Sequence, residues 1–597
     1  GHMYWRYFMW NFSGRQNDIQ GYGDIMHGNW ITGIKFLDEL RLGNQDELPD
    51  NLKNEKANNK YYMLPFLLGL LGMFYQYRKG KTGKQDFWVV MLLFIMTGIA
   101  IIVFLNQTPM EPRERDYAYA GSFYAYAIWI GLGVLSIWEF LNKKIKNIDP
   151  RVSAIAVTTV CLFAIPVNMA AQNWDDHNRH ARYATTAHAR NYLNSCAPNA
   201  ILFTYGDNDT FPLWYVQEVE GVRRDVRVVN LSLLSGSWYI DQMKRKAYES
   251  SGVPISFTHE QYRDGKRDYV LIRDQFKEGN LKDVMEFVAS DLPQTKLQGY
   301  IKELDFIPTR NVILPVDSAK VIANGTVKPQ DADQIVKDLR LHLPMQGLTK
   351  SQLMVLDILS TNNWERPVYF GIGMGSDAYM GLEKYFQLEG AAYRVVPIET
   401  KEAEFYDYGR IDSDILYDNI MNKFEWGNIK DPKVNIDFFH DQTIAVMKYR
   451  NTFLRLAQKL YDEGKQAEAV AVLDKSLEEI PLYQVPADNS MLFYIPMYYE
   501  LGETEKANHL LNELATNNYQ MLKYANSLEP KFANTPSIQQ EERLSIEVIK
   551  QLLAFATQAG QKELAQELQD KVLRLYNPSH ISPDKPLMKD TADKAGK

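Results

Sequence analysis

Four segments in the first third of the chain carry no charged side chain over nearly the thickness of a membrane: residues 61–77, 87–110, 117–138 and 152–171. About 20 apolar residues in a helix cross the ~30 Å hydrocarbon core of a bilayer, and a helix satisfies its own backbone in lipid. The pattern therefore predicts four membrane-spanning helices. The first is the weakest, because it is short and contains Pro65. The alternative is a set of buried helices in a soluble protein.

Charged residues in the loops orient the predicted helices. Cytoplasmic loops of membrane proteins carry an excess of lysine and arginine. We therefore place the connections at 78–84 and 139–151, which are rich in basic residues, in the cytoplasm. The middle connection, residues 111–116, mixes acidic and basic side chains and is placed on the other side. Counting crossings from there puts residues 1–60 and everything after Ala171 outside the cytoplasm.

The first 60 residues are rich in aromatic side chains, and the opening run MYWRYFMWNF carries a single charge, Arg6. Such a segment suits the end of a further spanning helix, which we favour, or a strip lying in the headgroup plane. The chain begins with Gly1 and His2 and shows no signal-peptide pattern. We expect this start to be the cut edge of a longer protein, the alternative being the remnant of a tag.

Charge separates the membrane part from the rest of the chain. Up to Ala171 there are 17 basic and 14 acidic residues (+3), which leaves 49 and 60 (−11) of the 66 and 74 in the whole chain. The formal net charge of −8 argues against nucleic acid as a partner. Two cysteines, Cys161 and Cys196, exclude a disulfide scaffold and a four-cysteine zinc site.

Residues 172–193 are predicted to form a helix that links the membrane part to the next domain. This helix carries His177, His180 and His188 at helical spacing, which is compatible with a metal site. We favour a solvated helix, because neither a cysteine nor an inward-facing apolar stripe supports a dry metal site. No metal ligand is therefore assigned.

A strand, turn, helix and strand predict a parallel βαβ unit over residues 200–231, with the helix at 213–220. Ligands of parallel sheets gather at the carboxyl ends of the strands. Asp207 and Asp209 directly follow the first strand and are therefore candidates for contact with a cation or with sugar hydroxyls. The alternative is that Asp209 or Thr210 caps the helix and Asp207 stabilises the turn.

These elements belong to a predicted α/β domain over residues 194–436. It contains no GxxxxGK[ST] phosphate loop, no GxSxG elbow and no HExxH helix, so nucleotide or hydrolase chemistry has no local signature. Its remaining elements are predicted as strands at 269–273, 311–316, 366–370 and 393–397 and a helix at 348–362.

The last third of the chain is predicted to be all helical. Amphipathic helices over residues 437–577 are broken at Gly464, Gly502 and Gly560, and the phrase LYDEGKQAEA around the first break resembles a tetratricopeptide hairpin. Hairpins of this kind bind peptides or neighbouring subunits, and the alternative is a packing appendage without a ligand. The tail, residues 578–597, is predicted to be disordered.

Three segments resemble a known family: NFSGRQND at 11–18, EPRERDYAYAGSFY at 111–124 and GDNDTFPLWY at 206–215. They are similar to the large multi-pass inner-membrane proteins of Bacteroidota whose N-terminal domain, a domain of unknown function, is protein O-mannosyltransferase-like. The likeness covers essentially the whole chain. It implies a C-type glycosyltransferase of the bacterial inner membrane, with a large periplasmic C-terminal part. The donor would be a polyprenyl-phosphate sugar, and the acceptor a protein or an envelope glycan.

In that family the glycosyltransferase region lies upstream, in additional membrane helices, so the resemblance makes this chain the C-terminal portion. The acidic first-loop motif of the C-type enzymes matches no position here. We therefore expect the segment alone not to catalyse transfer. No cofactor is assigned, and a divalent cation is a candidate.

Transfer from a lipid phosphate requires cations that hold the departing phosphate and a carboxylate that takes the acceptor proton. Arginine suits the first role, because its planar guanidinium grips phosphate oxygens with two hydrogen bonds. Arg113 and Arg115, in the outer loop at headgroup depth, are the lipid-phosphate-binding candidates, and the base is left open. The alternative is a loop whose charges, including Glu111, Glu114 and Asp116, neutralise one another.

The sequence thus predicts a multi-domain chain: a transmembrane bundle of four α-helices, an α/β soluble domain and all-α tetratricopeptide-like repeats. The favoured function is part of a periplasm-facing glycosyltransferase, with membrane lipid, the polyprenyl-phosphate donor and envelope proteins as partners. The alternative is a non-catalytic, membrane-anchored scaffold that binds envelope proteins through its α/β and helical-repeat domains. Small-molecule transport is disfavoured, because no spanning segment contains the buried Asp, Glu, Lys, Arg or His that such pathways need.

Overall fold

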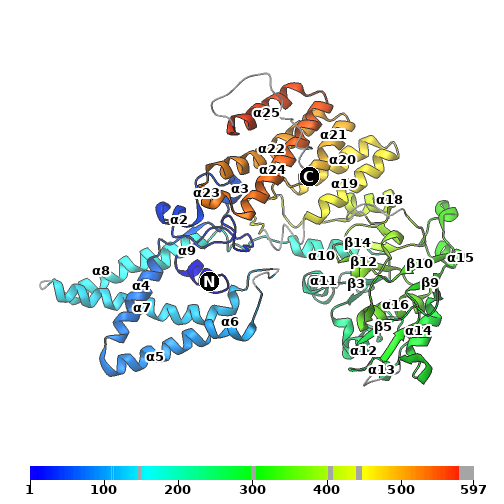
Figure 1. Cartoon of the computed structure of the whole chain (residues 1–597), viewed down its shortest axis with the longest axis horizontal. Coiled ribbons are helices and arrows are strands. Elements are labelled where there is room, and N and C mark those ends of the chain that lie inside the picture. Colours follow the sequence, from blue (N-terminus) through cyan, green and yellow to red (C-terminus); the bar gives the residue numbers. More distant parts are fainter. Residues whose placement is uncertain are drawn as a thin grey trace, which may run out of the picture. The chain divides into compact units, whose positions relative to one another are not determined.

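The structure, a computed structural model of the 597-residue chain, divides into two compact units (Figure 1). Unit 1 contains Gly1–His180, Asp437–Phe439 and Pro486–Lys597, and unit 2 contains Ala181–Ile436 and His440–Val485. Each unit therefore joins distant parts of the sequence. The tail predicted to be disordered lies outside the described residues. The structure describes residues 1–108, 111, 113–145, 149–297, 304–400, 408–437 and 447–576.

Apolar helices form the first part of unit 1. Among the described residues, three helices are long and apolar enough to cross a membrane: Gly80–Leu105, Asp116–Lys144 and Pro150–Asn173. A fourth apolar helix, α4 (Leu64–Tyr77), is shorter. The structure supports a membrane-associated protein, and a crossing by residues 61–77 stays a prediction. The long helices consist of α5 (Gly80–Met96) and α6 (Ile99–Leu105), of η1 (Asp116–Tyr119) and α7 (Ala120–Lys144), and of α8 (Pro150–Leu162), η2 (Phe163–Val167) and α9 (Asn168–Asn173).

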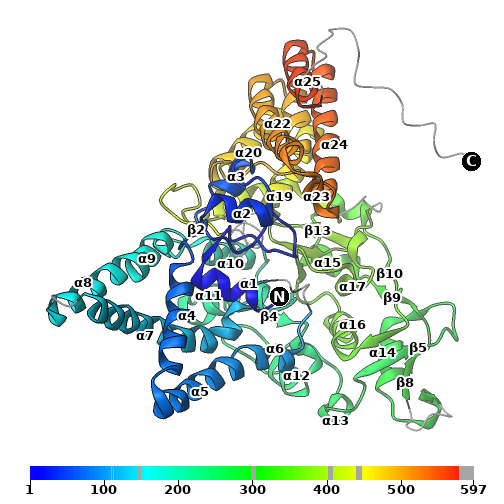
Figure 2. The same cartoon turned by 60° about the vertical axis from the view of Figure 1, so that its left-hand side comes forward.

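Glycines bring α4 and α7 into close contact, with α5 beside them (Figure 1, Figure 2). A Cβ atom at Gly72 would overlap the carbonyl oxygen of Trp129, and one at Gly133 would overlap that of Leu68. Small residues serve this purpose in membrane helices, where association depends on van der Waals packing. On α5, large apolar side chains such as Trp88 are exposed, as expected of a surface that faces lipid.

The aromatic N-terminal segment forms a short helix, α1 (Trp5–Phe12), within unit 1. Most of its side chains are buried, and its aromatic rings other than Trp5 form a cluster with rings of α5 and α7. The rings of Phe8 and Tyr126 meet edge to face, with centroids 4.8 Å apart, a favoured geometry for aromatic pairs. This segment is therefore part of the packed core among the apolar helices, and a further helix upstream stays a prediction.

The C-terminal part is helical, as predicted, and is built of helix pairs. Gly464, Gly502 and Gly560 lie between the paired helices with φ of 76°, 81° and 75°, a conformation that glycine adopts without strain after a helix. The predicted breaks are confirmed, and the identity of the pairs as tetratricopeptide repeats stays a prediction. Unit 2 contains α19 (Met447–Asp462) with α20 (Gln466–Glu479), and unit 1 contains α21 (Met491–Glu500) with α22 (Thr504–Ser527), then α23 (Pro530–Ala533), and α24 (Pro536–Gln558) with α25 (Lys562–Tyr576).

Residues 19–58 pack against helices from the other end of the chain, and both views show α2 and α3 beside α22 and α23 (Figure 1, Figure 2). Met26, Leu48 and Leu52 are buried together with side chains of α22 and α23. Around this core, Asp50 and Gln520 exchange hydrogen bonds of 3.0 and 2.6 Å. Unit 1 therefore has a second hydrophobic core, outside the apolar helices. The small elements of this segment and its flanks are β1 (Gly14–Arg15), α2 (Lys35–Leu42), α3 (Asp50–Lys53) and β2 (Asn59–Lys60).

A six-stranded mixed sheet forms the centre of unit 2, in the order β15-β13-β14-β12-β3-β4. The predicted βαβ unit is confirmed, because β3 and β4 are parallel neighbours joined by α11. On the other side of β3 lies β12, also parallel to it, whereas β13 and β14 pair antiparallel. The bounds are β3 (Ile201–Thr204), α11 (Asp207–Glu220), β4 (Arg227–Asn230), β12 (Val368–Gly371), β13 (Phe386–Leu388), β14 (Ala392–Val395) and β15 (Arg410–Ile411).

Two smaller sheets complete unit 2, in the orders β10-β9-β6 and β11-β5-β8-β7. The strands predicted at 269–273 and 311–316 are β5 and β9, and the helix predicted at 348–362 is the buried helix α16 (Lys350–Asn362). The strands are β5 (Tyr269–Ile272), β6 (Gly279–Asn280), β7 (Lys296–Leu297), β8 (Leu304–Ile307), β9 (Asn311–Pro315), β10 (Asp338–His342) and β11 (Gly347–Thr349). The helices are α12 (Ser237–Met243), α13 (His259–Tyr262), α14 (Leu281–Ala289), α15 (Ser318–Ala323), α17 (Ser376–Tyr379) and α18 (Ser413–Tyr417).

The linker predicted as one helix over residues 172–193 is interrupted. The helix α9 ends at Asn173 in unit 1, and α10 (Ala184–Asn194) begins in unit 2. In the polar run between them, side chains form some of the hydrogen bonds that the backbone would make in a helix. The Asn178 side chain, for example, accepts a hydrogen bond of 2.8 Å from the backbone amide of His180. Short polar side chains that bond the nearby backbone compete with helix formation in this way.

Candidate functional site

The carboxyl ends of β3 and β12 form the place where the sheet of unit 2 is best suited to bind a ligand. After β3 the chain passes through α11 to β4, on one side of β3. After β12 it continues to β13 and β14, on the other side. Connections that leave two parallel neighbours in opposite directions define a topological switch point, where open α/β sheets bind their ligands. Residues 205–209 and 372–375 follow the two strands at this point.

Asp207 and Asp209 lie in the first turn of α11, which starts earlier than the predicted residue 213. Gly206, with φ of 78°, lets the chain pass directly from strand to helix. The N-cap position is this glycine, so no side chain caps the helix there. Thr210, one of the predicted caps, instead donates its hydroxyl to the Gly206 carbonyl oxygen at 2.8 Å. The cap interpretation therefore finds no support in the geometry.

Asp209 is a largely buried carboxylate with one cationic neighbour. Its side chain is 12% exposed, and the ammonium of Lys448 lies 3.6 Å from Oδ1. Burial raises the pKa of Asp209 above its ordinary value, while the charge of Lys448 opposes this rise. Within the described part of the chain, no other ion pair or hydrogen bond reaches this carboxylate. Its neighbour Asp207 is exposed, so the two carboxylates have different environments.

Lys448, near the start of α19, lies between the segments that follow the two strands. A Cβ atom at Gly373, which has φ of 79°, would be 3.0 Å from the Lys448 ammonium. The same ammonium is the neighbour of Asp209. The next residue, Tyr449, shares a hydrogen bond of 2.9 Å between its hydroxyl and Nδ1 of His188 on α10. The start of α19 is thus held against α10, with its lysine at the switch point.

Tyr192, also on α10, brings an unpaired hydroxyl to the same sheet edge. The residue is 1% exposed, and among the described residues its hydroxyl has no hydrogen-bond partner. A Cβ atom at Gly371, the last residue of β12, would overlap this hydroxyl oxygen, so only glycine leaves room for it. Most buried polar atoms in proteins are paired. This hydroxyl is one of several buried polar atoms that the described structure leaves unpaired.

The three histidines of the predicted linker are divided between the two units. His188 belongs to unit 2, whereas His177 and His180 belong to unit 1. Burial, followed by the charge of Lys448, lowers the pKa of His188 to about 3, so its imidazole is neutral. The described residues include no group of three or more His, Cys, Asp or Glu side chains placed to hold a metal ion. Both cysteines are free.

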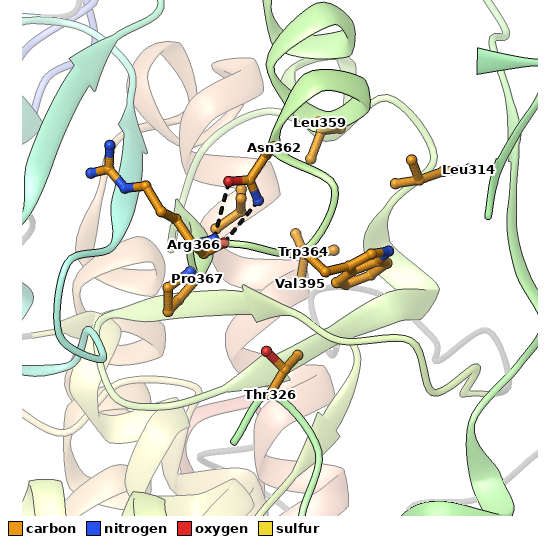
Figure 3. A pocket seen from close by; sticks show the side chains of 9 residues that line it. Leu314, Thr326, Leu359, Asn362, Trp364, Arg366, Pro367 and Val395 are labelled. Carbon is orange, nitrogen blue, oxygen red and sulfur yellow. Dashed lines mark hydrogen bonds between the residues drawn. The ribbon is translucent and has the colours of Figure 1, made fainter. Parts of the chain in front are cut away.

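A cavity at the opposite edge of the sheet, near the start of β12, is too small for a ligand (Figure 3). Its volume is about 10 Å³, roughly the space of one water molecule. In the close-up the guanidinium of Arg366 points away from Asn362. It donates to backbone carbonyl oxygens, including that of Asn199 at 2.8 Å. This arginine joins strands and is not open to a ligand.

In unit 1 the loop around Glu114, the predicted outer loop of the apolar helices, is fixed by a buried ion pair. The Arg6 guanidinium donates to both carboxylate oxygens of Glu114, at 2.8 and 2.6 Å, and the side chains are 7% and 13% exposed. The Tyr7 hydroxyl donates to the same carboxylate at 2.6 Å. Burial disfavours the charged form of Glu114. The hydrogen bonds and the positive charge of Arg6 outweigh this effect and lower the pKa of Glu114. Glu114 is therefore a structural anchor of the loop.

The two candidate arginines of this loop differ in their pairing. Arg115 donates to the Glu111 carboxylate at 3.2 Å and to the Tyr117 hydroxyl at 2.7 Å. Arg113 is half-buried and makes no ion pair with any residue that the structure describes. The interpretation as a self-neutralising loop thus fits Arg115 with Glu111, while Glu114 is neutralised by Arg6. Arg113 is the cation of this loop that is left without a carboxylate.

One family model matches unit 2. Residues 185–415 match TMEM260-associated domain 2. The match covers less than half of the chain, begins in α10 and includes β3, α11 and β12, and with them Tyr192, Asp207 and Asp209. Lys448 and the outer loop of unit 1 lie beyond it. No curated protein and no solved structure matches the chain.

The structure places each candidate residue and adds partners that the sequence pattern did not indicate. Asp207 and Asp209 occupy the predicted strand end, and Arg113 and Arg115 the loop at the end of the apolar helices. Sequence reasoning missed Lys448, because a lysine at the start of an amphipathic helix is an ordinary surface residue. It also missed Tyr192 and Arg6, whose roles depend on contacts with distant segments.

Proposed function

We propose that this chain is the C-terminal part of a periplasm-facing, membrane glycosyltransferase-like protein of the bacterial inner membrane. Its apolar helices carry an outer loop that contacts the phosphate of a polyprenyl-phosphate sugar, and a region upstream of this chain supplies the catalytic machinery. The acceptor is a protein or an envelope glycan. The resemblance of three segments to the Bacteroidota family supports this proposal, as do the three helices long enough to cross a membrane.

The observation that carries the proposal is the free cation of the outer loop. Arg113 is half-buried and has no carboxylate partner among the described residues, whereas the neighbouring Glu114 is held by Arg6. A guanidinium in this state can grip two phosphate oxygens without first breaking an ion pair. Arg115 must share its charge with Glu111. The two candidate residues are therefore given unequal roles, with Arg113 as the principal phosphate contact.

The test measures binding of radiolabelled polyprenyl phosphate to the protein in lipid nanodiscs. Arg113→Gln should weaken binding about tenfold, the effect of losing hydrogen bonds to a charged group. Arg113→Lys should be intermediate, because an ammonium lacks the bidentate fork. Lys143→Gln is the matched control, since Lys143 is an exposed cation in the loop predicted to be cytoplasmic.

Equal binding by wild type and Arg113→Gln would refute the phosphate contact. In the longer protein, Arg113→Gln should also abolish sugar transfer in cells. Unchanged transfer would leave only the scaffold role for this chain. The two measurements separate donor binding from the chemistry of the upstream region.

A second candidate function, recruitment of envelope proteins without chemistry, is favoured by a groove in the C-terminal helices. A cavity of about 190 Å³ lies between α22 and α25 and is lined by polar and apolar side chains, among them Asn512, Tyr519 and Leu568. A surface of this mixed character suits an extended peptide. Tyr519→Ala should then reduce co-purification of envelope proteins while leaving polyprenyl-phosphate binding unchanged.

A further inference from the structure

The helix α2 of unit 1 presents its apolar side chains outward and buries a charged one. Phe36 is 69% exposed and Leu40 is 56% exposed, and Leu37 beside them is also exposed. Side chains three and four residues apart share one side of a helix, so these three form one apolar face. The buried side chains of α2 are those of Asp38 and Leu42, on the opposite side. An apolar face that a folded unit leaves open marks an interaction surface.

Contacts on the other side of α2 fix the helix in this orientation. The Asp38 carboxylate accepts hydrogen bonds from the backbone amides of Thr32 and Gly33, at 2.7 and 2.8 Å. The guanidinium of Arg41 lies over the ring of Trp30, 3.9 Å from the ring centroid. Turning the helix to bury its apolar face would break these contacts. The exposure of that face is therefore a consequence of how the helix is held.

The start of α2 lies at the end of a helix that is long enough to cross a membrane. A Cβ atom at Gly33 would be 2.8 Å from Cβ of Lys60, and the Lys60 amide donates to the Gln172 side chain at 3.1 Å. Gln172 is the last residue but one of the 24-residue helix Pro150–Asn173, which at 1.5 Å per residue is about 36 Å long. The hydrocarbon core is ~30 Å thick, so the ends of such a helix reach the headgroups. Both views show α2 near the end of α9 (Figure 1, Figure 2).

We propose that α2 is an interfacial helix whose apolar face enters the headgroup layer of the bilayer that the long helices cross. Amphipathic helices of this kind lie in the plane of the interface, with the apolar side about 5–10 Å into the boundary between headgroups and acyl chains. The position of α2 is continuous with the membrane part, because Trp30, under Arg41, packs against the aromatic cluster among the apolar helices. The chain's own spanning helices thus bring lipid to this face, and no further partner is required.

This inference goes beyond the proposed function and is independent of it. It requires that the long apolar helices cross a bilayer, and it requires neither a phosphate contact at Arg113 nor sugar transfer. Binding of α2 to lipid would fix the height of residues 19–58, and of the helices packed on them, above the membrane surface. The polyprenyl-phosphate test and the test of α2 can therefore fail separately.

The test measures where single fluorophores on α2 lie in protein reconstituted into nanodiscs. Cys161→Ala removes the half-buried native thiol, the buried Cys196 remains, and a nitrobenzoxadiazole label is attached to Phe36→Cys or Leu40→Cys in this background. Both labels should be quenched by lipids that carry a nitroxide near the headgroup and protected from aqueous iodide. Their depth should be about 5–10 Å, as for other interfacial helices. Val89→Cys, at a 67% exposed residue of α5, is the positive control and should be quenched by lipid.

Phe493→Cys is the matched negative control, since Phe493 is a 63% exposed ring on α21 of the same unit. Its label should be quenched by iodide and not by lipid. Thermal unfolding of each labelled variant checks that unit 1 remains folded. If iodide quenches the label at residue 36 as strongly as the label at residue 493, α2 faces water and the proposal is overturned. Protection of residue 36 from both iodide and nitroxide lipid would also overturn it, because protein would then cover the face.

A second variant tests whether the apolar face itself holds α2 at the membrane. Phe36→Glu places a charge on this face, and a label on Leu40→Cys in the same chain should lose protection from iodide. Lys35→Glu changes an already charged, exposed position of the same helix and is the control, with the label at residue 40 still protected. Equal protection in the two variants would contradict insertion of the face.

Discussion

The buried ion pair between Arg6 and Glu114 makes a quantitative prediction about unit 1. Glu114→Ala removes the acceptor of four hydrogen bonds, two from Arg6 and one each from the Tyr7 hydroxyl and the Gly21 amide. Arg6, 7% exposed, keeps the carbonyl oxygen of Gly28 as an acceptor but loses its counter-charge. Removing one partner of a buried pair destabilises a protein by about 3–5 kcal/mol. We expect this loss for Glu114→Ala.

A double variant without either charge separates the effect of the lost counter-charge from that of the lost ion pair. Arg6→Met with Glu114→Leu removes both charges and fills similar volume, so the double variant should be far more stable than Glu114→Ala. The assay is thermal unfolding in nanodiscs. A loss of about 3 kcal/mol lowers the midpoint by about 6–12 °C in a domain of 150–250 residues. Unit 1 is larger, so the lower end is expected. Equal midpoints for the single and double variants would refute the reasoning.

The ion pair also predicts that unit 1 becomes less stable at acidic pH. Arg6 holds the pKa of Glu114 below its ordinary value of 4.5, despite the opposing effect of burial. A depressed carboxyl pKa contributes stability that is present above the unfolded value and is lost as pH falls through the folded value. The midpoint of wild type should therefore fall relative to that of Arg6→Met with Glu114→Leu below about pH 4.5. A constant difference from pH 7 to pH 3 would contradict this assignment.

Three further predictions concern single residues. Burial raises the pKa of Asp209, so the charged form of this carboxyl destabilises unit 2 at pH values above its ordinary pKa. Asp209→Asn should therefore raise the thermal unfolding midpoint at pH 7. A helix-cap role for Asp209 predicts no such gain. The pKa of His188 is about 3 in the folded state, far below its ordinary value of 6.5. Between these values the free energy of unfolding of unit 2 should fall by about 1.4 kcal/mol for each pH unit of acidification. His188→Gln should reduce this loss between pH 6.5 and pH 5. Gly72→Ala should lower the midpoint of unit 1 by forcing α4 away from Trp129, at about 1–3 kcal/mol, while Gly131→Ala, with open space around it, should not.

Local patterns predicted most elements of the fold because the physics that forms them is local. Three of these patterns span only a few residues each and can be recognised locally. They are long apolar runs, a strand followed by a glycine and a helix, and glycines at the ends of helices. The glycines at 464, 502 and 560 lie where the breaks were predicted, with positive φ. By contrast, the packing of residues 19–58 was not predicted, because their hydrophobic partners on α22 and α23 come from the far end of the chain.

The same distinction explains the candidate sites. Asp207 and Asp209 were predictable, since the strand-end rule for parallel sheets needs only one βαβ unit. The partner of Asp209 was not, because nothing in the sequence around Lys448 indicates where α19 begins against the sheet. In the predicted outer loop, nothing in the sequence pattern distinguishes Arg113 from Arg115. The structure distinguishes them through Glu111, which pairs with Arg115.

The two candidate sites differ from the well-formed buried ion pairs of the molecule in how their charges are paired. Arg267 and Lys350, each with a side chain 1% exposed, have carboxylates at 2.9 and 2.6 Å, and such pairs hold loops and helix ends in place. Asp209 has only an ammonium at 3.6 Å, and Arg113 has no carboxylate among the described residues. An incompletely satisfied charge is unfavourable unless a ligand completes it, so such groups gather where proteins bind and react. By this reasoning Asp209 and Arg113 are the charges at which we propose that a ligand binds.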